Sequence, residues 1–93
     1  MARLLVLGAG PAQLGVLADA RRRGLTVVVA DRDPSAPGFR YAHRRAIVSI
    51  EDELAIERLA RAEGVDSIVA PGGGRAAEIA VRVAAHLGLE AAA

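Results

Sequence analysis

The chain has 93 residues, 53% of them hydrophobic, and a formal net charge of +1 from 12 basic and 11 acidic side chains. These values predict one small domain with its own core, and near-neutral charge with only one Phe and one Tyr excludes a nucleic-acid-binding surface. The absence of cysteine and lysine excludes disulfides, Cys-based metal sites and lysine-dependent phosphate-loop or Schiff-base chemistry. No apolar run has the length of a membrane span and no signal segment opens the chain, so we expect a cytoplasmic protein without membrane contacts.

The first part of the chain predicts a strand, a glycine turn, a helix and a second strand. Residues 4–7 are a continuous apolar run, which is typical of a strand buried on both faces of a parallel sheet, and the run stops at Gly8. Pro11 suits the first turn of a helix, and Gly24 suits its end. The apolar stripe of this helix consists of Leu14, Leu17 and Ala18. Residues 26–30 form the second buried strand.

The remaining residues repeat this alternation. Residues 31–43 are a loop too rich in proline for a helix, and residues 46–50 are a third strand, whose polar Ser49 favours an edge position. A second helix begins at Ser49 or at residues 51–52 and runs to about Glu63, ending at Gly64. We expect its inward-facing residues to be Leu54, Ala55, Leu59 and Ala62. Residues 65–70 predict a fourth strand, 71–74 a second glycine turn, and 76–87 a third helix that Gly88 ends.

Strands that alternate with helices through right-handed crossovers predict a three-layer, Rossmann-like α/β domain over residues 1–90, with a short tail at 91–93. We expect a four-stranded parallel sheet of order 3-2-1-4 with three helices. The first and fourth strands then meet at the switch point, so both glycine turns lie at the carboxyl edge, where such sheets bind ligands. The fourth strand is expected to form the other edge of the sheet.

The first glycine turn predicts a binding site for a polar or anionic ligand. Gly8 and Gly10 precede a helix whose first N–H groups are positively polarised, and we expect Gly10 to need a positive φ. The dinucleotide fingerprint has a third glycine where this chain has Gln13, and the next glycine is Gly15. Gln13 is expected to crowd the path of a dinucleotide pyrophosphate, and its amide to hydrogen-bond a polar ligand. The alternative is that the glycines only make the turn.

Further candidates lie at the ends of other strands. Residues 72–74 form a second backbone cradle, with Arg75 placed to neutralise an anion, although an ordinary flexible loop explains this segment as well. Asp31 follows the first turn by about 20 residues, where dinucleotide-binding domains carry a ribose-binding acid. No residues are spaced for catalysis or for metal binding. The predicted substrate-binding residues are Gly8, Gly10, Pro11, Gln13, Gly15, Asp31, Gly72, Gly73, Gly74 and Arg75.

Residues 5–15, Leu-Val-Leu-Gly-Ala-Gly-Pro-Ala-Gln-Leu-Gly, resemble the opening of ATP-grasp enzymes. The nearest likeness is to carbamoyl-phosphate synthase large chains, biotin carboxylases and phosphoribosylaminoimidazole carboxylase ATPase subunits. Residues 29–34 and 36–42 are similar to the second strand and following loop of that family, and residues 60–70 to its helix, Gly-Val-Asp and apolar strand. The resemblance covers nearly the whole chain, and residues 13–15 are its most specific element.

This resemblance implies the N-terminal, preATP-grasp domain of a carboxylate–amine or carboxylate–thiol ligase, whose two glycine turns face the active-site cleft and hold a carboxylate or amine substrate. The parent enzyme would activate a carboxylate as an acyl phosphate with ATP and Mg²⁺. Those cofactors belong to the ATP-grasp domain, which this chain lacks. We therefore expect the chain alone to bind no cofactor and to be inactive, and to work with an ATP-grasp domain in cis or in trans. Residues 71–75 depart from the family pattern, which leaves the substrate class open.

Two other functions remain open at this point. A small NAD(P)- or nucleotide-binding module would use Gly8, Gly10 and Asp31. A non-catalytic docking domain, or a homodimer, would instead cover the apolar fourth strand, residues 68–70.

Overall fold

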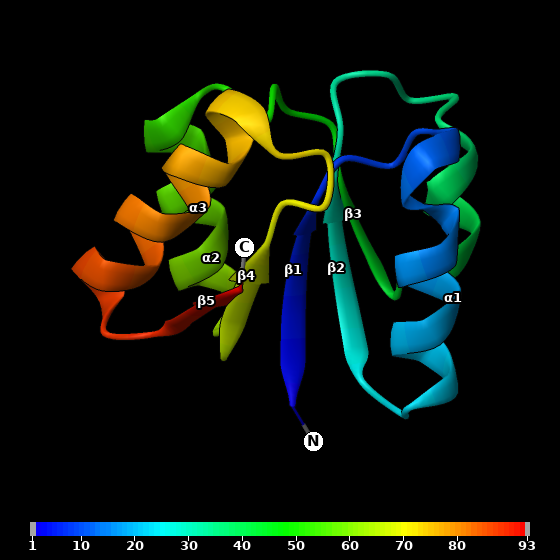
Figure 1. The fold of residues 1–93 in the computed structure, drawn as a ribbon, viewed down its shortest axis with the longest axis horizontal. Coiled ribbons are helices and arrows are strands. Elements are labelled where there is room, and N and C mark those ends of the chain that lie inside the picture. The colour runs from blue at the N-terminus through cyan, green and yellow to red at the C-terminus, as the bar shows by residue number, and fades with distance from the viewer. Residues whose placement is uncertain (1, 93) are drawn as a thin grey trace.

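Five parallel strands form one sheet between two layers of helices in the computed structural model, which describes residues 2–92 and the side chains of residues 2–89 (Figure 1). The strands are β1 (Arg3–Leu7), β2 (Thr26–Ala30), β3 (Arg44–Ala46), β4 (Ser67–Val69) and β5 (Glu90–Ala92). The helices are α1 (Leu14–Arg22), α2 (Glu53–Glu63) and α3 (Gly74–Leu87), with the short 3-10 helices η1 (Pro11–Gln13) and η2 (Pro37–Tyr41). The predicted three-layer α/β class is confirmed.

The strand order is β3-β2-β1-β4-β5, which confirms the predicted order 3-2-1-4 and adds a strand. β1 pairs with β2 from Arg3↔Thr26 onward and with β4 from Leu4↔Ser67 onward, so the switch point lies between β1 and β4. The expectation that β4 forms an edge is wrong, because β5 pairs with it in parallel. Residues 91 and 92 of the expected tail lie in β5, and residue 93 lies outside the described residues. The domain end at residue 90 stays a prediction.

The two faces of the sheet carry separate halves of the core. α1 and η2 cover one face, where Val6, Leu17 and Val29 are among the buried side chains. α2 and α3 cover the other, where Leu5 and Ile79 are fully buried. Successive residues of β1 and β2 therefore point into opposite halves, which explains their uninterrupted apolar runs. Within residues 2–92, no helix combines the length and apolarity that crossing a bilayer requires.

Two details of the elements differ from the sequence predictions. β3 lies at residues 44–46 instead of 46–50, and it forms the predicted edge of the sheet. The chain leaves the sheet after Ala46, whose carbonyl accepts the Asp31 N–H. The next residue, Ile47, is 47% exposed. The inward face of α2 was predicted correctly at Leu59, which packs against the core, and wrongly at Leu54 and Ala62, which are exposed. Ile56 and Ala60 are its buried residues, whereas Leu54 is 59% exposed. The contacts of α2 with α3 and the sheet decide this face.

The loop predicted over residues 31–43 contains η2, which packs against the first glycine turn. The Gly38 N–H donates to the Ala9 carbonyl at 2.7 Å, so the two backbones touch. A Cβ on Gly38 would lie 2.6 Å from Leu17 Cδ1 and 2.7 Å from the Ala9 oxygen. The backbone of η2 therefore packs directly against the first glycine turn and fixes its position.

Two charged contacts join α2 to α3. Arg82 donates to Glu53 Oε1 at 2.8 and 3.0 Å, and His86 Nδ1 lies 2.7 Å from Glu57 Oε1. The hydrogen bond with His86 is the main cause that lowers the pKa of Glu57 below its ordinary value of 4.5; partial desolvation opposes it and Arg61 adds to it.

These contacts predict an acid-sensitive stability. Because folding lowers the pKa of Glu57, its ionised form stabilises the fold above the ordinary value of 4.5, and this contribution is lost as the pH falls through the lower folded pKa. We expect the Tm of the wild type to fall more steeply than that of Glu57→Gln between about pH 5 and about pH 3. Calorimetry of both proteins across this range measures the difference. Glu51→Gln is the control, since Glu51 forms no ion pair within residues 2–89, and equal slopes for Glu57→Gln and the wild type would contradict the prediction.

Candidate functional site

Two glycine turns meet at the carboxyl edge of the sheet (Figure 1). The first turn (residues 8–10) follows β1, and the second turn (residues 71–74) follows β4. They lie side by side because β1 and β4 are hydrogen-bonded neighbours. Gly8 has φ +109°, and Gly73 and Gly74 have φ +69° and +62°, so both turns use conformations that side chains disfavour. The predicted meeting of the two turns is thus present in the structure.

The side chain of Gln13 fills the space between the turns. A Cβ on Gly8 would lie 3.4 Å from Gln13 Cδ, one on Gly10 would lie 3.1 Å from Oε1, and one on Gly72 would lie 3.3 Å from Nε2. We call this space, bounded by the three glycines, the notch. Within the described residues, the amide of Gln13 makes no hydrogen bond, so its donor and acceptor are both available at the notch.

The glycines near Gln13 differ in what they require. Gly10 has φ −73° and ψ 177°, so the expectation of a positive φ there is wrong. Its role is to leave room for Gln13 Oε1, and Gly8 carries the positive φ. Gly15 lies on the exposed side of α1 with nothing within 4 Å of its Cβ position, and Pro11 is exposed at the start of η1. Neither of these two borders the notch.

Most N–H groups of the first turn are used within the protein. The Gly8 N–H donates to the Ala30 carbonyl at 2.8 Å, and the Ala9 N–H donates to Asp31 Oδ2 at 2.8 Å. The Gly10 N–H donates to no acceptor among residues 2–92. This turn therefore offers less to an anion than the sequence predicted, and the carboxylate of Asp31 already occupies its positive end.

Further open N–H groups of the site lie where the second turn passes into α3. The Gly73 N–H donates to the Ala70 carbonyl at 3.0 Å. Among the residues that the structure describes, the N–H groups of Gly74, Arg75 and Ala76 have no protein acceptor, as expected in the first turn of a helix. The side chain of Arg75 is exposed and forms no ion pair within residues 2–89. The α3 end of the site is thus the electropositive one.

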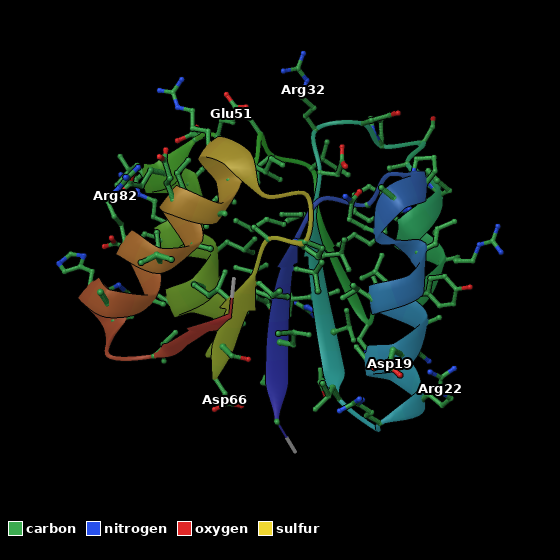
Figure 2. The ribbon with its side chains drawn as sticks, viewed as in Figure 1. Asp19, Arg22, Arg32, Glu51, Asp66 and Arg82 are labelled. Carbon is green, nitrogen blue, oxygen red and sulfur yellow. The ribbon has the colours of Figure 1, made fainter. Side chains whose placement is uncertain are left out.

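Asp31 stands between the notch and a neighbouring cavity. Its second oxygen, Oδ1, accepts the Asp33 N–H at 2.9 Å, so both carboxylate oxygens are held by backbone donors. The cavity has a volume of about 250 Å³ and is lined by Asp31, Arg32, Ser49, Ile50 and Glu51. Figure 2 shows Arg32 and Glu51 projecting from this edge of the molecule. The sequence analysis missed residues 49–51 as lining, because it placed the end of a strand at 49–50 and the start of a helix at 51.

The donor set of the site does not fit a metal centre. Among residues 2–92, no three side chains of His, Asp or Glu lie close enough together to hold a metal ion. The site instead offers an amide, backbone N–H groups and one guanidinium. These groups can donate and accept hydrogen bonds, and the guanidinium can pair with an anion.

Comparison with known proteins gives two kinds of likeness. The formate-dependent phosphoribosylglycinamide formyltransferase of Solidesulfovibrio magneticus is 40% identical over 67 residues, which are 72% of this chain and 17% of that protein. The N5-carboxyaminoimidazole ribonucleotide synthetase of Thermotoga maritima matches in structure with a TM-score of 0.80 at 20% identity, over 98% of this chain and 24% of that one. A UDP-glucose 4-epimerase of Thermus thermophilus, in complex with NAD, matches with a TM-score of 0.74 at 18% identity, over 95% and 35% of the two chains. No family model matches the chain.

The sequence identity to the formyltransferases decides between these likenesses, because the two structural matches show the fold alone. The chain is a homologue of the N-terminal region of ATP-grasp enzymes. The resemblance to ATP-grasp enzymes is therefore confirmed. This preATP-grasp domain spans about 17% of the length of the curated relative it matches.

The preATP-grasp domain brings together part of the predicted site. Gly8, Gly10 and Gly72 surround the amide of Gln13, and Asp31 borders the same edge. Gly73, Gly74 and Arg75 shape the start of α3 beside them. The signal for this grouping was the position of both turns after neighbouring strands.

Proposed function

We propose that this preATP-grasp domain holds the amine substrate of an ATP-dependent carboxylate–amine ligase, and that it is inactive alone. The observation that supports this most is the free amide of Gln13, placed between two glycine turns at the switch point of the sheet. In the parent ligase, a carboxylate would take the γ-phosphoryl group of ATP and release ADP, and the amine held here would displace phosphate from the resulting acyl phosphate to form the amide. The ATP-grasp domain is the partner in this proposal, in the same polypeptide or a separate one, and the setting is the cytoplasm.

The charge distribution of the site supports an amine over a carboxylate. The Asp31 carboxylate accepts the Ala9 N–H of the first turn, and its negative charge favours a hydrogen-bond donor of the ligand on that side of the notch. The open N–H groups at the start of α3, together with Arg75, favour an anionic group on the other side. A substrate with an amine at one end and a phosphate at the other fits both sides. Phosphoribosylglycinamide, which the relatives formylate by their name, has this chemistry.

The test is titration of the isolated domain with phosphoribosylglycinamide, followed by calorimetry and by amide shifts in NMR spectra. We expect shifts at Gly10, Gly72 and the Gln13 side chain, and binding that Gln13→Ala weakens about tenfold, since one hydrogen-bonding amide is worth about 1–1.5 kcal/mol. Gly15→Ala is the matched control, because it alters the same helix away from the notch. Formate is titrated separately as the carboxylate candidate. Unchanged affinity in Gln13→Ala would remove this site from the proposal.

One observation favours a second function. Asp31 lines a cavity at the place where dinucleotide-binding domains hold a ribose, which suits a small nucleotide-binding module. This alternative predicts that the wild type binds NADH and that replacing Gln13 leaves the affinity for NADH unchanged. Thermal-shift measurements with NADH test it directly.

A further inference from the structure

Most parts of a dinucleotide-binding edge are present in this domain. The switch point lies between β1 and β4, and Gly8 and Gly10 form the first turn. The Gly10 N–H is open to the carboxyl edge. Asp31 ends β2 beside a cavity of about 250 Å³ that is smaller than a whole ligand site and suits one part of a ligand. The 95% structural coverage with an NAD-bound epimerase shows that the fold itself accommodates such an edge.

The notch is the part that is closed. In dinucleotide-binding turns, the second glycine lets the pyrophosphate approach the backbone, and the third position is also glycine. Here the second glycine is Gly10, and Gln13 Oε1 stands 3.1 Å from its Cβ position. Gln13 Nε2 reaches across to the second turn, 3.3 Å from the Cβ position of Gly72. The amide thus spans the opening from one turn to the other.

We propose that Gln13 is a specificity-determining residue that closes a latent dinucleotide groove in this domain. Its amide presents a hydrogen-bond donor and acceptor at the notch and occupies the volume that a pyrophosphate needs against Gly10. This inference concerns the exclusion of dinucleotides, and it does not depend on the proposed amine substrate.

The experiment measures NADH binding by fluorescence titration of the wild type and of Gln13→Gly. We expect the variant to bind NADH with a Kd at least about tenfold lower, a change of about 1.4 kcal/mol in binding free energy. Ala12→Gly is the matched control, because it adds a glycine at the exposed position next to Gln13 in η1 and leaves the Gln13 amide in place. Its Kd should equal that of the wild type. Amide shifts at Gly10 upon NADH addition would locate the gained site.

Two results would overturn the proposal. Wild-type binding as tight as that of Gln13→Gly would mean that the amide excludes nothing, and an absence of NADH binding in both would mean that another feature closes the groove. Gln13→Ala, which keeps a Cβ and the local helix propensity, replaces Gln13→Gly if circular dichroism shows that the glycine variant is unfolded. Titration of the same proteins with phosphoribosylglycinamide reports separately on the proposed function, so the two can fail independently.

Discussion

Gly38→Ala is expected to lower the free energy of unfolding by about 3 kcal/mol, at the upper end of the cost of overpacking a core. The added Cβ would lie 2.6 Å from Leu17 Cδ1, 2.7 Å from the Ala9 oxygen and 2.8 Å from Ala9 Cα. Two of these atoms belong to backbone that the first glycine turn holds in place, so η2 has to move away. That movement also strains the hydrogen bond from the Gly38 N–H to the Ala9 carbonyl. Urea denaturation of the wild type and the variant measures the loss.

Gly15→Ala is the control for this prediction. Its Cβ would meet nothing within 4 Å, and α1 gains a better helix former, so stability should rise by up to about 1 kcal/mol. Opposite signs for two glycine-to-alanine changes in the same domain would show that backbone contact decides the outcome. A Gly38→Ala protein as stable as the wild type would mean that η2 does not press against the first turn.

Asp31→Ala is expected to cost about 2 kcal/mol of stability. Its carboxylate accepts the Ala9 N–H at 2.8 Å and the Asp33 N–H at 2.9 Å, and it thereby ties the loop after β2 to the first turn. Removal leaves the N–H of the buried Ala9 without a charged acceptor. We expect the Ala9 amide to exchange faster with solvent, which hydrogen exchange monitored by NMR measures alongside urea denaturation.

Asp33→Ala is the matched control, because Asp33 is exposed and, among residues 2–89, its side chain accepts only the Ser35 N–H, at 2.9 Å. Its loss should be about 0.5–1 kcal/mol, with no change at Ala9. If Asp31→Ala and Asp33→Ala cost the same and the Ala9 amide stays protected, Asp31 does not hold the turn.

The central part of the fold was predictable from the sequence because its signals are local. β1 and β2 are buried on both faces, and such strands appear as unbroken apolar runs bounded by Gly8 and Asp31. Gly64 and Gly88 end α2 and α3 in left-handed conformations, as their positions indicated. The order of strands then followed from crossover handedness.

The features that were missed depend on contacts between distant segments. β3 is a short edge strand that pairs only with β2 among the described strands. The apolar residues Val48 and Ile50, which follow it, pack against the core from a loop and form no strand pairing. The contact of Gly38 with Leu17 joins η2 to α1, and no local pattern indicates it. The same holds for the reach of Gln13 to Gly72, which belongs to a turn almost sixty residues further along the chain. The sequence could place both turns at one edge, but it could not show which atoms fill the space between them.

The direction of the strands has a practical consequence for measuring these affinities. β1 begins at Arg3, whose N–H donates to the Asp66 carboxylate at the end of the sheet opposite the glycine turns (Figure 2). Because the sequence contains no lysine, amine-reactive labels modify no side chain at the glycine turns. A sensor chip or a fluorophore attached at the Arg3 end of β1 therefore lies opposite the groups that are proposed to meet a ligand.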